Sequence, residues 1–401
     1  MRVVVASESR FARTPDGRVW TRSGPGYSVW ARYLMAFDAV RIVARVRDVA
    51  SLPDGAYSVD GPDVEVWPVP YYQGPRQYLM KRRSIRRAVT AAVGPHDAYI
   101  LRVPGQIATV LSDELRRRRQ PYALEVIGDP YEEFARGAAD HPLRPVFRRV
   151  FTSRMVEQCR FAAAASYVTE ASLQSKYPVR AGAPAIACSD VDLAAAAYAP
   201  SSRPASVFQG AHRLVSVGML EQQSKGVDVL IAAVARLAAS RPALHLVHVG
   251  DGRLRPQLER MAADLGISGR ITFAGALPAG DAVRDKLDAG DLFVMPSRIE
   301  GLPRALVEAM ARALPAIGSA AGGIPEVLPR HALVPPGDPA RLAESIDRML
   351  ADPERMSKES ARNLARAGDF SAEILQASWR RFYEAVRDVS LRPASTVANK
   401  V

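Results

Sequence analysis

Two glutamates flank the start of a predicted helix. Glu300 and Glu308 are eight positions apart, and Gly301 and Pro303 lie between them. Proline suits the first turn of a helix, where its missing N–H costs no hydrogen bond, so we expect a helix over residues 303–312. This helix would leave Glu300 on the preceding loop and place Glu308 about a turn and a half along the same side. Carboxylates in such positions can accept hydrogen bonds from the paired hydroxyls of a sugar or a ribose. Two unrelated solvated glutamates are the alternative interpretation.

The first amides of the same helix are a second polar feature. We expect the backbone N–H groups of Leu302, Arg304 and Ala305 to point out of the helix N-terminus, where the helix itself offers them no acceptor. Such an end binds anions through these donors and through the helix dipole. The sequence therefore predicts a diphosphate site beside two carboxylates.

The segment from Pro296 to Met310 resembles the E-x7-E motif of the retaining glycosyltransferases of family 4, which have the GT-B fold. The resemblance covers roughly residues 213–330 and includes four further motifs in the family's order. Each motif is weak alone, and together they are specific. They are Val217-Gly218 with Lys225 to Leu230, His248 to Gly252, Ile271 to Gly275, and Gly322 to Glu326.

The resemblance implies roles for the residues in these motifs. It implies that Glu308 binds the ribose of a nucleotide, that Glu300 binds hydroxyls of the donor sugar, and that Lys225 binds the diphosphate. A surface lysine before a helix is the alternative for Lys225. The remaining residues expected to line the donor site are Gly218, Gly250, Gly275, Leu302, Pro303 and Arg304.

This chain departs from the family pattern at one basic position. Met219 stands where the family has the arginine that shares the diphosphate with the lysine. Either Lys225 neutralises the leaving diphosphate with less help, or another arginine, such as Arg304, compensates.

The first half of the chain carries less specific candidates. Gly24 and Gly26 are expected to form a loop after the first strand where the backbone can approach a ligand, with a simple helix N-cap turn as the alternative. The family's histidine is missing after the predicted strand at 121–127, where this chain has Glu125 and Asp129. We expect these two carboxylates to face the ligand and to bind hydroxyls or accept the acceptor's proton, or else to be plain strand-end carboxylates.

Apolar runs alternate with helix-like stretches along the whole chain, which is typical of parallel sheets covered on both faces. A Pro-rich stretch at 178–211 predicts a linker. The predicted strands are 2–6, 40–46, 64–68, 97–103, 121–127, 213–217, 243–249, 271–274, 292–295 and 316–319. The predicted helices are 27–37, 77–93, 107–118, 227–239, 255–265, 282–287, 303–312, others after Pro339, and 372–391.

The expected fold class is α/β, as in GT-B proteins, with two Rossmann-like βαβ domains facing each other across a cleft. We expect an acceptor-binding domain at 1–190 and a nucleotide-sugar-binding domain at 191–371. The helix at 372–391 is aromatic along one side and is expected to pack back on the first domain. Ligands of open α/β sheets bind at the carboxyl ends of the strands, so the site is expected between the domains.

Composition excludes several classes of protein. The 401 residues are 48% hydrophobic and 24% charged, as in globular proteins, and two cysteines cannot form a disulfide framework or a Cys-rich zinc module. No apolar run approaches the roughly 18–20 residues that span a bilayer. The run at residues 3–6 is interpreted as a first strand rather than a signal sequence. We expect a cytoplasmic protein, with peripheral contact at the inner face of the membrane as an alternative.

The net charge of +12 comes mainly from the first half of the chain, where 28 basic and 20 acidic residues leave +8. The densest basic runs are 81–87 and 116–119. Nucleic-acid binding is not favoured, because neither aromatic ladders nor zinc spacing accompany these runs. Contact with an anionic membrane surface and an ordinary solvated helix face remain as alternatives.

The sequence as a whole predicts transfer of a sugar from a nucleotide-diphospho sugar, of UDP or GDP type, to an acceptor hydroxyl with retention at the anomeric carbon. The acceptor is expected to be a sugar, a lipid-linked molecule or a small molecule. We assign no metal ligand and no bound cofactor, and expect metal-independent transfer. A sugar-nucleotide epimerase on the same two-domain plan and a non-catalytic sugar-nucleotide-binding module are the alternatives.

Overall fold

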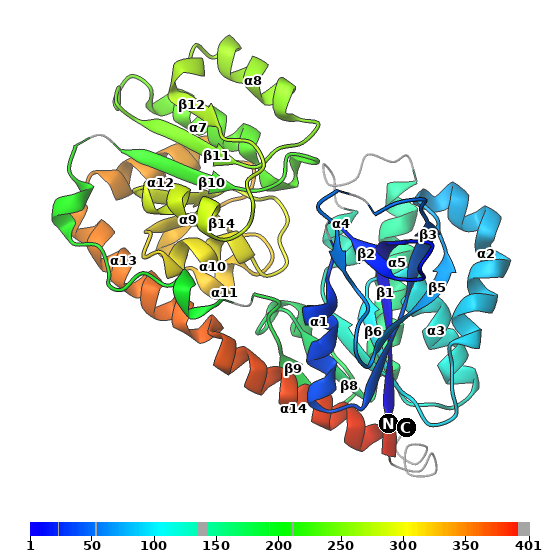
Figure 1. The fold of residues 1–401 in the computed structure, drawn as a ribbon. Helices are drawn as coiled ribbons and strands as arrows, with labels where there is room; N and C mark the ends of the chain where they lie inside the picture. The colour runs from blue at the N-terminus through cyan, green and yellow to red at the C-terminus, as the bar shows by residue number, and fades with distance from the viewer. Residues whose placement is uncertain (23, 53, 135–142, 192, 211, 392–401) are drawn as a thin grey trace. The chain divides into compact units, whose positions relative to one another are not determined.

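The computed structural model describes residues 1–391 except 23, 53, 135–142, 192 and 211. The chain divides into two compact units (Figure 1). Unit 1 comprises Met1–Pro130, Arg149–Cys188 and the chain from Ala377 onward, and unit 2 comprises Tyr131–Arg148 and Ser189–Gln376. No helix among the described residues is long and apolar enough to span a bilayer.

Unit 1 is built on a nine-stranded sheet whose central strand, β1, pairs in parallel with β3 and β6. The path β5-β3-β1-β6-β7-β8-β9 is parallel throughout, and only β2 and β4 pair antiparallel. The strands are β1 (Arg2–Arg13), β2 (Val19–Thr21), β3 (Ala39–Asp48), β4 (Tyr57–Ser58), β5 (Val64–Pro70), β6 (Ala98–Val103), β7 (Ala123–Val126), β8 (Ala164–Tyr167) and β9 (Ala185–Ala187).

Helices bury the apolar residues of this sheet. Val4, Leu101 and Leu124 from three neighbouring strands pack in one cluster with Leu111 of α3 and Ile85 of α2. Burial of a side chain of this size contributes about 1.5–3 kcal/mol. The helices of this part of the chain are α1 (Tyr27–Ala31), 3-10 helix η1 (Arg32–Met35), α2 (Gly74–Ala91), α3 (Gln106–Arg117), α4 (Pro130–Glu133), α5 (Arg144–Phe161) and α6 (Ser172–Lys176).

Unit 2 has a six-stranded, fully parallel sheet in the order β12-β11-β10-β13-β14-β15. Strands β10, β11 and β12 are added in turn toward one edge of the sheet, and β13, β14 and β15 are added in turn toward the other edge. The strand order therefore reverses between β10 and β13. The strands are β10 (Arg213–Val217), β11 (His245–Val249), β12 (Ile271–Phe273), β13 (Leu292–Met295), β14 (Ala316–Ser319) and β15 (Leu333–Val334).

The helices of unit 2 alternate with these strands. Val229 and Leu230 of α7 pack in one apolar cluster with Leu214 of β10 and Ile346 of α12. The elements are η2 (Ala195–Ala197), η3 (Ala205–Phe208), η4 (Gln223–Lys225), α7 (Val227–Leu237), α8 (Arg255–Asp264), η5 (Ser268–Arg270), α9 (Asp281–Asp288), α10 (Arg304–Ala311), α11 (Ile324–Val327), η6 (Arg330–Ala332), α12 (Pro339–Leu350), α13 (Pro353–Ala367), η7 (Gly368–Phe370) and α14 (Ala372–Leu391).

The C-terminal helix α14 ends within unit 1. The Arg32 guanidinium lies 3.8 Å from the centre of the Trp379 ring, and Arg32 Nε donates to the Tyr383 hydroxyl at 3.1 Å. The rings of Tyr383 and Tyr33 are 4.7 Å apart. The aromatic side of the helix is therefore buried against the α1–η1 segment.

The observed division differs from the expected boundaries in one segment. Residues 131–148 group with unit 2, although we expected them in a domain at 1–190. Within this segment Arg148 Nε donates to the Tyr131 carbonyl at 2.8 Å, and its guanidinium stacks on the Tyr131 ring. The described ends of the segment thus pack on each other, which periodicity could not show.

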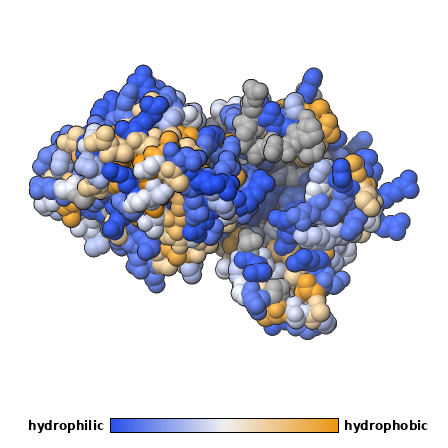
Figure 2. All heavy atoms as spheres, turned by 90° about the horizontal axis from the view of Figure 1, so that it is seen from above, coloured by the Kyte–Doolittle hydropathy of each residue, from blue (hydrophilic) through white to orange (hydrophobic). Residues whose placement is uncertain are grey.

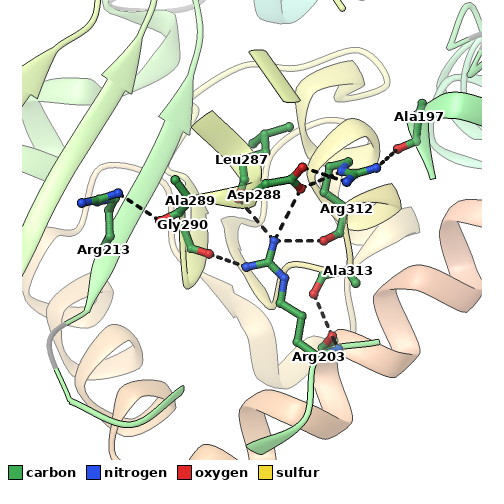
Figure 3. A network of polar contacts seen from close by, with 10 residues as sticks. Ala197, Arg203, Arg213, Leu287, Asp288, Ala289, Gly290, Arg312 and Ala313 are labelled. Carbon is green, nitrogen blue, oxygen red and sulfur yellow. Dashed lines mark hydrogen bonds and ion pairs between the residues drawn. The ribbon is translucent and has the colours of Figure 1, made fainter. Parts of the chain in front are cut away.

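The stretch predicted as a linker, 178–211, is anchored rather than loose where it enters unit 2. The Arg203 guanidinium donates to the carbonyls of Gly290 at 2.5 Å and Arg312 at 3.1 Å (Figure 3). Arg312 in turn binds Asp288 through two nitrogens at 2.7 and 2.8 Å and donates to the Ala197 carbonyl. Burial lowers the pKa of Arg203, and the carbonyls keep its charge solvated.

We predict that Arg203→Ala lowers the free energy of unfolding by about 2–4 kcal/mol, because half-buried carbonyls lose their donors. Urea denaturation measures this loss. Arg213→Ala is the matched control, since exposed Arg213 also donates to a carbonyl of this loop, that of Ala289, and should cost less than about 1 kcal/mol. Equal losses in the two variants would show that the Arg203 network does not anchor the segment.

Candidate active site

The candidate site lies in unit 2 where the strand order reverses. The loops after β10 and β13 follow adjacent parallel strands, at the point where ligands of open α/β sheets bind. The first loop carries Gly218 and Lys225, and the second carries Glu300. The topology therefore brings together residues that are 75 positions apart in the chain.

An ion pair joins the two loops. Lys225 Nζ lies 2.5 Å from Glu300 Oε1, and the Ser297 hydroxyl donates to the same oxygen at 2.8 Å. The Glu300 side chain is 8% exposed and that of Lys225 is 30% exposed, so the lysine is the more accessible of the two charges. The stem of Lys225 lies over Gly218, where an added Cβ would meet it at 3.1 Å. Sequence reasoning missed Ser297, although it stands three residues before Glu300.

Two glycines permit this approach of the loops. Gly226 has φ +64°, and a Cβ there would lie 2.1 Å from the Pro296 carbonyl oxygen. Gly322 has φ +54°, and a Cβ there would lie 1.7 Å from the Glu300 carbonyl oxygen. Any side chain would both strain the backbone and displace the Glu300 loop. The Gly322-Gly323 motif therefore supports the carboxylate from behind, and Gly323 N donates to the Gly301 carbonyl at 2.9 Å.

A second ion pair holds the same loops from the outside. Arg298 binds both carboxylate oxygens of Asp228 at 2.7 Å and donates to the Gln223 carbonyl at 2.8 Å. The hydrogen bonds to Asp228 raise the pKa of the Arg298 guanidinium. This fork-to-fork pair fixes the β13 loop against η4 and the start of α7. No separate sequence signal marks this pair beyond the position of Asp228 after Lys225 and Gly226.

Helix α10 begins one residue later than expected. Pro303 is the N-cap rather than a helical residue, and its carbonyl accepts from the amides of Leu306 and Val307. The amides of Arg304 and Ala305 are thus in the first turn, where the helix supplies no acceptors. Arg304 Nε donates to Glu308 Oε1 at 2.9 Å, so this arginine is already engaged with a carboxylate of the same helix. Leu302 is half-buried in front of the helix and packs on the core.

The third predicted loop of unit 2 follows β11. Gly250 N donates to the Gly275 carbonyl at 2.9 Å, and a Cβ on Gly250 would lie 1.9 Å from the Gly218 carbonyl oxygen. Beneath these glycines His248 is fully buried, and its Nε2 lies 3.0 Å from that same Gly218 oxygen. Burial lowers the pKa of His248 to about 4, so the ring is neutral and Nε2–H donates.

The glycines of unit 1 are placed differently from the expectation. Strand β1 does not end at residue 6 but runs to Arg13, and a hairpin into β2 separates it from Gly24 and Gly26. Gly26 caps α1, a helix of five residues, and its backbone packs on the Tyr57 ring. The Tyr57 hydroxyl donates to the Gly24 carbonyl at 2.6 Å. The two glycines therefore follow the β2 hairpin rather than the first strand, and Gly26 is the N-cap of α1, as in the alternative interpretation. Approach of a ligand to their backbone stays a prediction.

Glu125 is also placed differently. We expected it to face a ligand, but it is 1% exposed in the central strand β7. The Tyr33 hydroxyl donates to Glu125 Oε1 at 2.7 Å, and Arg102 lies 3.5 Å from Oε2. Burial raises the pKa of Tyr33 well above its usual value, so this hydroxyl keeps the proton that it donates. Glu125 thus belongs to the polar interior beneath η1 and α14.

Asp129 follows the carboxyl end of β7 as expected. Lys176 Nζ lies 2.7 Å from Oδ2, and the Tyr177 hydroxyl donates to Oδ1 at 2.5 Å. Its side chain is 10% exposed. Both carboxylate oxygens therefore have partners from the segment after β8, which makes Asp129 a fixed acceptor rather than a mobile base.

A further carboxylate in unit 1 was missed. Glu8 follows the register shift of β1 and caps α3, since Ile107 N donates to its Oε1 at 2.7 Å. The Tyr72 hydroxyl donates to Oε2 at 3.0 Å, and Arg45 pairs with the same oxygen at 3.3 Å. The one available signal was the polar run that follows residues 3–6, which marks a change in the strand rather than its end.

A family comparison identifies the part of the chain that carries this site. Residues 211–352 match the family model described as Glycosyl transferases group 1. The matched span is less than half of the 401 residues. It includes the Lys225–Glu300 pair, the glycine motifs and α10.

The similar proteins differ in how much of this chain they match. Protein CapJ of Staphylococcus aureus is 23% identical over 88% of each chain. The GDP-mannose-dependent monoacylated alpha-(1-6)-phosphatidylinositol monomannoside mannosyltransferase of Corynebacterium glutamicum is 37% identical over 38% of this chain, which spans 42% of that enzyme. The relative of higher identity thus matches less than half of this chain.

The fold is that of the GT-B glycosyltransferases, with two parallel-sheet α/β domains. The crystal structure of Anabaena HepE in complex with UDP-glucose matches with a TM-score of 0.62 at 17% identity and covers 95% of this chain and 98% of that one. The match includes both units, whereas the family model covers only the second. This confirms the expected fold class.

The expectation of metal-independent transfer overlooks one sequence feature. Residues 190–192 read Asp-Val-Asp, which is an Asp-x-Asp sequence. Residue 192 lies outside the described residues. Among the residues that the structure does describe, no group of three His, Cys, Asp or Glu side chains is placed to hold a metal ion. Metal independence stays a prediction.

The buried His248 gives a pH-dependent prediction. Its pKa is lower in the folded state than the usual 6.5, so the unfolded chain binds the extra proton first. The free energy of unfolding should therefore fall by up to about 1.4 kcal/mol per pH unit as pH drops from about 6.5 toward 4. Urea denaturation at several pH values measures this slope.

His248→Phe should flatten that slope, because the replacement cannot be protonated. His96→Phe, at an exposed histidine, is the matched control and should leave the slope unchanged. An identical slope in the wild type and in His248→Phe would contradict the role of the buried imidazole.

Proposed function

We propose that this protein transfers a sugar from a nucleotide-diphospho sugar to an acceptor hydroxyl, with retention at the anomeric carbon and without a metal ion. The observation that carries the proposal is the Lys225–Glu300 pair beside the N-terminus of α10, at the point where the strand order of unit 2 reverses. The likeness of the segment 296–310 to the E-x7-E motif of family 4 supports the retaining assignment.

The chemistry of the leaving group suits this arrangement. When the bond between the sugar and the diphosphate breaks, negative charge develops on the phosphate oxygens. Lys225 and the first amides of α10 are fixed donors for that charge, which therefore need no rearrangement as it forms. Lys225 is the partly exposed member of its ion pair, so its ammonium can meet a phosphate while it still contacts Glu300.

The carboxylates supply the complementary half of the site. Glu300 Oε1 is already bound by Lys225 and Ser297, which leaves Oε2 as the oxygen for a sugar hydroxyl. Glu308 lies on the second turn of α10 with a side chain that is 28% exposed, so its carboxylate can bind a ribose hydroxyl. Met219 is 57% exposed and offers no charge. Lys225 therefore neutralises the diphosphate without the arginine that the family has at the position of Met219.

The donor and the acceptor are proposed by class. UDP- and GDP-sugars are the candidate donors, because HepE binds UDP-glucose and the mannosyltransferase uses GDP-mannose by its name. We assign acceptor binding to unit 1, with a sugar, a lipid-linked molecule or a small molecule as the acceptor. Asp129, held by Lys176 and Tyr177, is the hydroxyl-binding carboxylate of that unit.

Incubation with a panel of UDP-, GDP- and TDP-sugars, with and without acceptors, tests the proposal. We expect release of the nucleoside diphosphate and a product whose anomeric configuration, read by NMR, matches that of the donor. Bound nucleotide without any release would indicate a binding module. Conversion of the sugar while it stays attached to the nucleotide would indicate an epimerase.

Glu308→Ala should weaken binding of the preferred nucleoside diphosphate about 10- to 100-fold, since a charged acceptor of hydrogen bonds is lost. Isothermal titration calorimetry measures the affinity. Glu344→Ala is the matched control: it removes an exposed helix glutamate that pairs with Arg341 of α12 outside the predicted donor site, and it should leave the affinity unchanged. Unchanged affinity in Glu308→Ala would remove Glu308 from the site.

A further inference from the structure

Helix α2 of unit 1 carries a concentration of uncompensated charge. Its 18 residues include six basic side chains and no acidic one. Lys81 donates to the Tyr71 carbonyl at 2.7 Å, but the five arginines have no ion-pair partner among the described residues. They are Arg76, Arg82, Arg83, Arg86 and Arg87.

The helix geometry sorts these residues into two rows. Ile85 and Val89 face the core. Arg76, Met80, Arg83 and Arg87 follow one another at spacings of four, three and four, so they form one row on the outer side of the helix. Leu79, Arg82 and Arg86 form the adjacent row.

The apolar members of these rows are unusually open. Met80 is 86% exposed and Leu79 is 66% exposed, although each lies among arginines. In Figure 2 the right-hand edge, where Figure 1 places α2, shows projecting hydrophilic side chains beside apolar ones. Arginines four apart repel each other and weaken an isolated helix, so the pattern is unfavourable unless a polyanion covers it.

A groove of about 260 Å³ continues the second row onto α3 and α5. Leu79, Arg82, Arg86, Val150, Phe151 and Arg154 are among its lining residues. The carboxylate in this groove, that of Asp113, lies 3.5 Å from Arg154 and forms no ion pair with an arginine of α2. The groove therefore presents two free guanidinium groups between exposed apolar side chains.

The other basic run of unit 1 is different in kind. Arg116 pairs with Glu157 at 2.6 Å, Arg118 pairs with Glu114 at 2.7 Å, and Arg117 also pairs with Glu114. Three of the four arginines in this run thus pair with carboxylates, whereas no ion pair joins any arginine of α2 to a carboxylate among the described residues. Of the two runs that composition singled out, the one on α2 is therefore the less compensated.

We propose that α2 and the adjacent groove bind the surface of an anionic lipid bilayer, with Met80 and Leu79 entering the headgroup boundary and Arg82 and Arg86 binding lipid phosphates. Apolar side chains among arginines fit the boundary between headgroups and acyl chains. A nucleic acid would offer Met80 no apolar surroundings, and the two exposed rows contain no aromatic residue for bases to stack on. The aromatic residues that line the groove, Tyr78 and Phe151, are partly buried. The proposal goes beyond sugar transfer and does not require it.

Co-sedimentation with vesicles tests the proposal. We expect the full chain to sediment with phosphatidylcholine vesicles that contain phosphatidylglycerol, to ignore pure phosphatidylcholine vesicles, and to bind less as salt rises. Each basic side chain near such a surface is worth about fivefold in affinity, so Arg76→Gln/Arg83→Gln/Arg87→Gln should lose about 100-fold. This variant should fold, because it removes repulsion within one helix.

Two further variants complete the test. Arg236→Gln/Arg260→Gln/Arg348→Gln removes the same charge from exposed positions of α7, α8 and α12, and should bind vesicles nearly as the wild type does. Leu79→Ser/Met80→Ser should weaken binding to anionic vesicles. The binding that remains should be lost at high salt, because only electrostatic attraction is left. Equal losses in the two arginine variants, or binding to a single-stranded oligonucleotide but not to vesicles, would overturn the proposal. Titration with UDP or GDP is measured separately, so failure here leaves sugar transfer standing.

Discussion

The ion pair between Lys225 and Glu300 is the constraint on which the site of unit 2 depends. It joins loops from two strands that are adjacent only because the sheet reverses its order there. Glu300 is nearly buried, and Lys225 and Ser297 provide its carboxylate with an opposite charge and a hydrogen bond. The neighbouring structure keeps these groups within hydrogen-bond distance before any ligand binds, which is the preorganisation that stabilisation of a leaving diphosphate requires.

The supports of this pair explain several motifs that have no charge of their own. Because Gly226 and Gly322 have no Cβ, the backbones of Pro296 and Glu300 can pack directly against them. The Asp228–Arg298 ion pair holds the same loops together on their outer side. His248 holds the Gly218 carbonyl from below without adding charge, because its burial keeps the ring neutral at ordinary pH. The same motifs that mark the family in the sequence are thus positioning elements for one lysine and one carboxylate.

Sequence periodicity predicted unit 2 well because its strands are short apolar runs that end at loops. The strands at Arg213–Val217, Leu292–Met295 and Ala316–Ser319 have the expected bounds, and so has the helix at Ala372–Leu391. Unit 1 was harder. The polar half of β1 and the hairpin to β2 have no apolar period, and the burial of Glu125 depends on Tyr33 and Arg102, which come from elements far apart in the chain. Partners such as Ser297, Arg298 and Glu8 follow from tertiary contacts that no local pattern records.

If Lys225 binds the diphosphate, its replacement should weaken binding of a nucleoside diphosphate but not of the nucleoside. Calorimetry of Lys225→Gln with UDP and uridine, and with GDP and guanosine, separates the two affinities. We expect affinity for the preferred diphosphate to fall at least tenfold and affinity for the matching nucleoside to stay within about twofold, because only the phosphates meet the ammonium. An equal loss for diphosphate and nucleoside, or no loss for either, would show that Lys225 does not bind the diphosphate.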